Sequence, residues 1–242
     1  MSLLANLKSD ESIAGERDSV GGSVLDSALY KAKVILAYLT KASSGAVGLV
    51  LNLKTEAGRE IRQTIYMTSG TAKGGTNYYT NKDGEKQYLP GFLVANSLAL
   101  LTIGKEISDV ATETKVVNAY SKEAKADVPT KVEMLVELLG QEILVGLIRQ
   151  TVDKNQKNDA GEYIPTGETR DENEIDKLFR ARDRMTVAEI RAQAQSADFA
   201  DKWEAKFTGV VKNKSKGAGA NAGTAGAPKT AGTPKPKASL FA

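Results

Sequence analysis

The hydrophobic pattern in the first third of the chain predicts three β-strands. Apolar residues alternate along an extended chain from Tyr30 to Thr40, and the alternation resumes from Val47 to Leu53. A tight turn over residues 56–59 then leads into a third strand, Glu60 to Thr68. On the first strand the alternation assigns one face to Tyr30, Ala32, Val34, Leu36 and Tyr38.

The two faces of the third predicted strand differ in chemistry. Ile61, Ile65 and Met67 are expected to point inward. The opposite face is expected to carry Arg62, Thr64, Tyr66 and Thr68. This outward face offers a cation and an aromatic ring to a ligand.

The rest of the first 152 residues mixes helices and strands. A long loop, Ser69 to Pro90, is followed by a buried helix, Phe92 to Ile103, and a strand, Thr114 to Tyr120. Thr130 and Glu133 have the spacing of a capping box and predict a short helix, and Ile143 to Val152 reads as a last strand. This order predicts a mainly β protein with helices: an OB-fold, the five-stranded Greek-key barrel, elaborated with insertions and a C-terminal helical appendage.

The pattern changes after Val152. An extended excursion over residues 153–171 precedes helical signals from Asn173 to Arg184, a second capping box at Thr186 and Glu189, and a last helix with an aromatic stripe of Phe199, Trp203 and Phe207. We therefore predict a flexible N-terminal arm (1–27), an OB-fold domain (28–152), a loop and helical appendage (153–209) and a disordered basic tail (210–242).

The amino-acid composition excludes several classes of metal site and catalytic site. The chain has no cysteine and no histidine, which excludes disulfides, thiolate or imidazole zinc sites and histidine-dependent nucleophiles. No paired carboxylates stand out as an acid–base set. We expect no enzyme activity, no catalytic residue, no metal and no cofactor.

Charge is distributed unevenly. Six lysines and no acidic residue follow Val211, so the first 211 residues carry a net charge of −3 and the remainder +6. The first fifteen residues do not have the pattern that predicts a signal peptide, and no apolar run is long enough to cross a bilayer. We expect a soluble cytoplasmic protein that does not associate with membranes.

The densest functional signal is the loop over residues 70–88, which interleaves tyrosines with lysines. Tyrosine rings stack on unpaired bases for about 1–3 kcal/mol each, and lysines follow the phosphates. The alternative is that the tyrosines only fold the loop onto the barrel. With the outward face of the preceding strand, the candidate site for single-stranded DNA comprises Arg62, Tyr66, Lys73, Tyr78, Tyr79, Lys82, Lys86 and Tyr88.

The chain resembles the single-stranded DNA-binding proteins of lytic tailed bacteriophages over roughly residues 30 to 210. The resemblance lies in the segments 73–79, 89–92, 127–132 and 163–168 with the following 173–175. It implies an OB-fold protein that coats exposed strands during phage replication, recombination and repair in the cytoplasm of the host cell.

The tail departs from that family. Many such proteins end in an acidic tail closed by an aromatic residue, whereas this tail is basic. The resemblance implies that the tail recruits replication or recombination proteins, or host RNA polymerase, through Lys235, Lys237, Leu240 and Phe241. The alternative function is a phage structural or scaffold-type interaction module whose tyrosine and lysine loop meets protein instead of nucleic acid.

Overall fold

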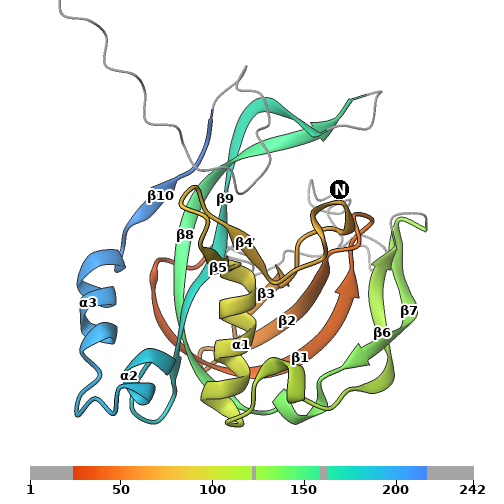
Figure 1. Cartoon of the computed structure of the whole chain (residues 1–242). Helices are drawn as coiled ribbons and strands as arrows, with labels where there is room; N and C mark the ends of the chain where they lie inside the picture. The colour runs from red at the N-terminus through yellow and green to blue at the C-terminus, as the bar shows by residue number, and fades with distance from the viewer. Residues whose placement is uncertain (1–23, 122–123, 159–162, 217–242) are drawn as a thin grey trace, which may run out of the picture. The chain divides into compact units, whose positions relative to one another are not determined.

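The computed structural model describes residues 24–121, 124–158 and 163–216. They form a mainly β protein with a large antiparallel sheet and few helices (Figure 1). The chain divides into two compact units, the first made of residues 1–149 and 172–211 and the second of residues 150–171 and 212–242. The predicted arm falls outside the described residues up to residue 23, and the predicted tail does so from residue 217.

A three-stranded meander is the centre of the first unit. Strands β1 (Ala28–Lys41), β2 (Val47–Thr55) and β3 (Glu60–Tyr66) pair antiparallel in sequence order, as the alternation predicts. The first half of β1 also pairs with β8 (Glu142–Lys157), and its second half pairs with β7 (Ala126–Met134). Strand β6 (Glu113–Ser121) pairs with β7 along its length.

A β-bulge lets β1 serve two partners. The register with β2 shifts between Val34 and Leu36. A bulge inserts one extra residue into the strand, so the side chains that follow it point to the opposite face. Val34 therefore packs in the main core, whereas Leu36 and Tyr38 pack in a separate cluster with β7. The prediction that Leu36 and Tyr38 share a face with Tyr30 is wrong for this reason.

The main core lies between the inner face of the meander, β8 and helix α1 (Pro90–Thr102). Leu49, Leu51 and Leu53 of β2 are fully buried there. The helix begins very close to the end of β3. A Cβ added at Gly91 would lie only 2.1 Å from the carbonyl oxygen of Tyr66. Only glycine fits this approach, which fixes where α1 meets the sheet.

Strand β9 (Tyr163–Arg180) pairs with β8. Its last part, in the first unit, packs Ile175 and Leu178 into the main core. The backbone N–H of Ile175 donates to the side-chain oxygen of Gln63 on β3 (2.8 Å). This contact uses a side chain and is not the backbone pairing of two adjacent strands. No closed barrel is detected among the described residues.

Two predicted helices are strands. The segment from Thr130 to Glu133 belongs to β7, and only a short 3₁₀ turn, η3 (Val136–Leu138), follows it. Pairing with β6 satisfies the backbone of this segment, so the capping-box spacing has no helix to cap. The segment from Asn173 to Arg180 is the end of β9, where Leu178 packs in the main core and Phe179 against another cluster. Burial on both sides hides the alternation of a strand.

The predicted helical signals near residue 190 are confirmed. Helix α2 (Val187–Arg191) begins with the Thr186–Glu189 capping box, and α3 (Asp198–Phe207) follows. Trp203 is buried against Phe179, and its indole N–H donates to Asp176 (2.8 Å). The aromatic stripe is therefore mainly core, although Phe199 is 42% exposed.

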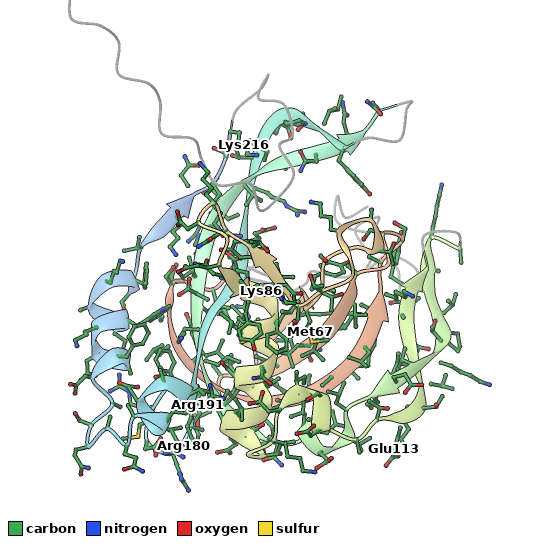
Figure 2. All side chains as sticks on the ribbon, in the orientation of Figure 1. Met67, Lys86, Glu113, Arg180, Arg191 and Lys216 are labelled. Atoms are coloured by element: carbon green, nitrogen blue, oxygen red, sulfur yellow. The ribbon has the colours of Figure 1, made fainter. Side chains whose placement is uncertain are left out.

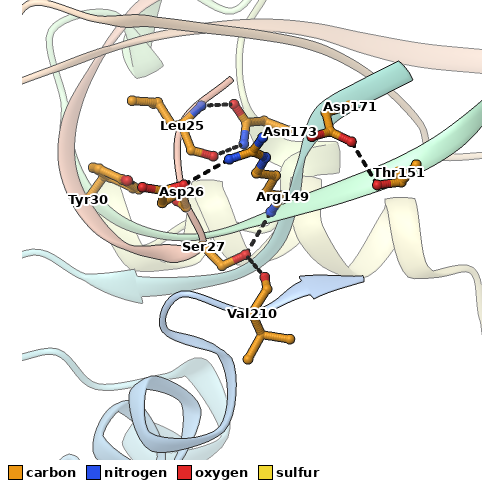
Figure 3. Close-up of polar contacts among 9 residues, drawn as sticks. All are labelled: Leu25, Asp26, Ser27, Tyr30, Arg149, Thr151, Asp171, Asn173 and Val210. Carbon is orange, nitrogen blue, oxygen red and sulfur yellow. Dashed lines mark hydrogen bonds and ion pairs between the residues drawn. The ribbon is translucent and has the colours of Figure 1, made fainter. Parts of the chain in front are cut away.

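The start of the described chain is fastened to the first unit by side chains from distant segments (Figure 3). The amide of Asn173 bonds both to the backbone N–H of Leu25 (2.8 Å) and to its carbonyl oxygen (2.7 Å). The buried hydroxyl of Ser27 accepts from the N–H of Arg149 and donates to the carbonyl of Val210. These bonds hold β1 at its first residues.

The second unit contains the outer parts of β8 and β9 and most of β10 (Val211–Asn213). Thr151 and Asp171 join the two long strands through a 2.7 Å side-chain hydrogen bond (Figure 3). Lys154 and Glu168 form an ion pair further along the ribbon (2.9 Å). The excursion predicted over residues 153–171 is thus a β-ribbon in its described part.

Candidate nucleic-acid interface

The outward face of β3 has the orientation that the sequence predicts, except at Thr68. That residue lies beyond the end of β3, is only partly exposed, and its hydroxyl accepts a hydrogen bond from the N–H of Val47 (2.8 Å), so the prediction that it shares this face is wrong. Ile61, Ile65 and Met67 are buried, whereas Arg62, Thr64 and Tyr66 are exposed on the other side of the sheet. None of the exposed three contributes to the main core. Their side chains are available to a ligand that lies across the sheet.

A glycine on β2 makes room for the Tyr66 ring. Gly48 lies opposite Tyr66 in the ladder, and a Cβ there would lie 3.1 Å from the Tyr66 ring and 3.3 Å from the methyl groups of Thr40 and Thr64. The ring therefore lies over the backbone of β2 while 49% of the residue stays exposed. An aromatic face is held at the surface on a rigid strand.

A groove of about 450 Å³ runs beside this row, between the meander and the β6–β7 hairpin. Arg62 and Thr64 line one wall, and Ala119 and Thr130 of the hairpin line the other. Tyr38, Val50, Val132 and Met134 pack as a small cluster at this face. The groove thus has an apolar base and a guanidinium on its wall, which suits a base with its phosphate.

The loop between β3 and α1 contains its own small sheet. Strands β4 (Tyr78–Thr80) and β5 (Lys86–Tyr88) form a hairpin after the short 3₁₀ turn η1 (Thr71–Lys73). Its turn is built by Asn81, whose side-chain oxygen accepts from the N–H groups of Asp83 and Glu85. The sequence predicted a loop here and neither of the two strands.

Pairing in this hairpin separates the tyrosines. Tyr78 lies opposite Tyr88, and residues that lie opposite each other share a face. Tyr79 lies opposite Gln87 on the other face, where its hydroxyl donates to the Gln87 side chain (2.7 Å). The structure therefore does not bring the three tyrosines onto one surface.

The Tyr78–Tyr88 face is the one that packs toward α1. The Tyr88 ring lies 5.0 Å from the Phe92 ring, and the Lys86 ammonium lies 4.7 Å from the centre of the Tyr78 ring (Figure 2 labels Lys86). Tyr88 is still 56% exposed. Part of this face folds the hairpin onto the protein, and part stays open.

The predicted cations of β3 and of the loop have no acidic partner among the described residues. Arg62, Lys73, Lys82 and Lys86 are exposed, and none forms an ion pair within residues 24–121, 124–158 and 163–216. Lys31, by contrast, bonds to Glu56 and Glu142, and these hydrogen bonds raise its pKa. The unpaired cations can bind phosphate without first breaking an ion pair.

Sequence reasoning missed the second wall of the groove. Ala119 and Thr130 belong to a hairpin whose second strand was predicted as a helix. Alternating Val128, Thr130, Val132 and Met134 carried the signal of a strand. The predicted tail residues Lys235, Lys237, Leu240 and Phe241 lie outside the described residues.

Other classes of site receive no support. No group of three or more acidic residues within the described ranges is arranged to hold a metal ion. In the same part of the chain, every helix is too short or too polar to cross a membrane. No protein-family model matches the chain, and no curated protein sequence is significantly similar to it.

Proposed function

We propose that the protein binds single-stranded DNA, with little dependence on sequence and without catalysis, across the outer face of β3. The observation that carries the proposal is the exposed row of Arg62, Thr64 and Tyr66, which the core does not use and of which Arg62 and Thr64 line the groove. Exposed aromatic rings on rigid strands beside unpaired cations are the recurring features of single-strand binding sites.

The arrangement of strands supports an OB-type barrel for residues 28–152, with insertions and a helical appendage. In that fold the outer face of strands 2 and 3 binds oligonucleotides. Here the bulged β1 pairs with β2, β7 and β8. The side-chain bond between Gln63 and Ile175 brings the end of β9, from outside residues 28–152, to the edge of β3. We take the β6 and β4–β5 strands as elaborations of the five-stranded plan.

The proposed role is protection of exposed strands during phage DNA replication, recombination and repair in the host cytoplasm. The β4–β5 hairpin adds Tyr78, Tyr88 and Lys86 to the binding surface. The basic tail adds phosphate attraction, and its Leu240–Phe241 terminus recruits a replication or recombination protein or the host RNA polymerase. No metal or cofactor is needed, because binding uses only charge and stacking.

An electrophoretic shift assay tests the proposal. Purified full-length protein is titrated into a labelled single strand and into the duplex of the same sequence. We expect a shift of the single strand at concentrations that leave the duplex free, because only unpaired bases offer their faces to tyrosine. Failure to shift either form would reject DNA binding and favour a structural or scaffold-type interaction module.

A further inference from the structure

A second pocket, of about 580 Å³, opens between the β4–β5 loop and the connection from α1 to β6. Its walls are mainly apolar and aromatic: Leu39, Met67, Tyr78, Phe92, Ile107 and Val110 line it. Met67 and Val110 are buried members of the main core, so the pocket reaches down to the core. Pockets of this size and lining are typical sites for a flat organic ring.

Polar groups lie among these apolar walls. Asn77 is among the residues that line the pocket, and its side-chain amide has no hydrogen-bond partner among the described residues. The Thr68 hydroxyl accepts a bond from the N–H of Val47 (2.8 Å) and still has its own hydrogen to donate. An amide offers donors and an acceptor together, which matches the edge of a nucleobase.

The position of the pocket relates it to the proposed DNA surface. Leu39 lines both this pocket and the groove beside Arg62. Met67 and Thr68 follow Tyr66 directly in the chain, and Lys86 holds a cation 4.7 Å from the Tyr78 ring at the pocket. Because Met67 faces the opposite side of the sheet from Tyr66, a bound strand would have to pass round the end of β3 to place one base in the pocket, where Lys86 could meet its phosphate.

We propose that this pocket receives one unstacked nucleobase of the bound strand, held between Tyr78 and Phe92, with Asn77 bonding to its edge. The inference rests on the proposed function, and it adds a defined base-insertion site to a surface that otherwise only stacks bases. Single-stranded bases are recognised in this way because their faces and edges are both free.

Photochemical crosslinking tests the inference. A short oligothymidylate with 5-iododeoxyuridine in place of some thymidines is bound to the full chain and irradiated, and mass spectrometry locates the adducts. We expect an adduct on Phe92, which lies inside the pocket, in addition to an adduct on Tyr66. Binding with an adduct on Tyr66 and none on Phe92 or Tyr78 would overturn the inference and keep the proposed function.

A pocket-filling variant provides the matched binding measurement. Ser108 lies exposed at the pocket lining, so Ser108→Trp should block the entrance without changing the core. We expect binding roughly 5-fold weaker or more, loss of the Phe92 adduct and retention of the Tyr66 adduct. Gln195→Trp, at an exposed site between α2 and α3, should bind as the unaltered protein does.

Asn77→Leu keeps the size of the side chain and removes the amide. We expect weaker binding with an unchanged unfolding midpoint, since the amide bonds to nothing described in the folded protein. Unaltered affinity in both Ser108→Trp and Asn77→Leu would reject base insertion. If the unaltered protein fails to bind any single strand, the proposed function itself fails, and the inference fails with it.

Discussion

Tyr78 lies directly opposite Tyr88 in the β4–β5 ladder, so the two rings share one face of the hairpin and Tyr79 occupies the other. Three tyrosines that look equivalent in the sequence therefore have different surroundings. Tyr78 lines the pocket beside Phe92, and the Tyr79 hydroxyl is bonded to Gln87. This difference predicts different contributions to binding.

Tyr78→Ala should weaken binding of a single strand by about 1–3 kcal/mol, the usual contribution of a stacked base. Tyr79→Ala should cost clearly less, because its ring faces away from the pocket. Fluorescence anisotropy with a labelled oligonucleotide measures both, and thermal unfolding checks that each variant is folded. Equal losses for the two variants would show that the hairpin does not bind through one face.

Arg62→Ala should reduce the salt dependence of binding as well as the affinity. If four to six cations contact phosphate, log K should fall with log salt at a slope of roughly −3 to −4. Each lost contact should make this slope shallower by about 0.7. Arg182→Ala removes the same charge from the turn after β9 and should leave the slope unchanged. A slope near zero for the unaltered protein would contradict an ionic groove.

Removal of residues 217–242 should weaken binding modestly at low salt, and the loss should shrink as salt increases. The removed segment carries three lysines and no acidic residue, and screening shortens its reach to about 8 Å at physiological ionic strength. Leu240→Ala with Phe241→Ala should leave DNA affinity unchanged, since no charge is lost. Anisotropy at two salt concentrations compares the three proteins, and tighter binding by the truncated form would mean that the tail competes with DNA.

Acid should remove the stabilising effect of one ion pair at the end of β9. The Arg180 guanidinium donates two hydrogen bonds to the Asp183 carboxylate, and these bonds hold the pKa of Asp183 below its ordinary value. The ionised Asp183 therefore stabilises the fold at pH values above the unfolded-state pKa of about 3.9. This contribution is lost as the pH falls through the lower folded-state pKa.

The Asp183→Asn variant tests this linkage. It should have a lower free energy of unfolding than the unaltered protein at pH 7, and the difference should shrink as the pH falls below about 3.9. Urea unfolding at several pH values measures the difference. A gap that stays constant down to the acid limit would mean that the Asp183 carboxylate does not contribute through its charge.

Local patterns predicted the meander well because its strands have one face in the core and one face toward solvent. The inward set of Ile61, Ile65 and Met67 is confirmed for this reason. Prediction failed where both faces are covered, as at Leu178 and Phe179, and where a distant strand decides the conformation, as β6 does for Thr130. The bulge after Val34 has no local signal in the sequence.

The candidate site was predicted in part. Exposure of Arg62 and Tyr66 followed from alternation alone, and the lysines of the loop are exposed as expected. The separation of Tyr79 from Tyr78 could not be predicted, because it depends on a two-stranded register inside a segment taken as a loop. The groove itself needs the β6–β7 hairpin, which only long-range pairing creates.

The central claim is that single-stranded DNA binds across the outer face of β3. The most direct test is an anisotropy titration of a double variant, Arg62→Gln with Tyr66→Leu, which keeps apolar packing over Gly48. The account predicts affinity at least roughly 10-fold weaker than that of the unaltered protein, with an unchanged unfolding midpoint, because one ionic contact and one stacking surface are lost. Unchanged affinity of the folded double variant would contradict it.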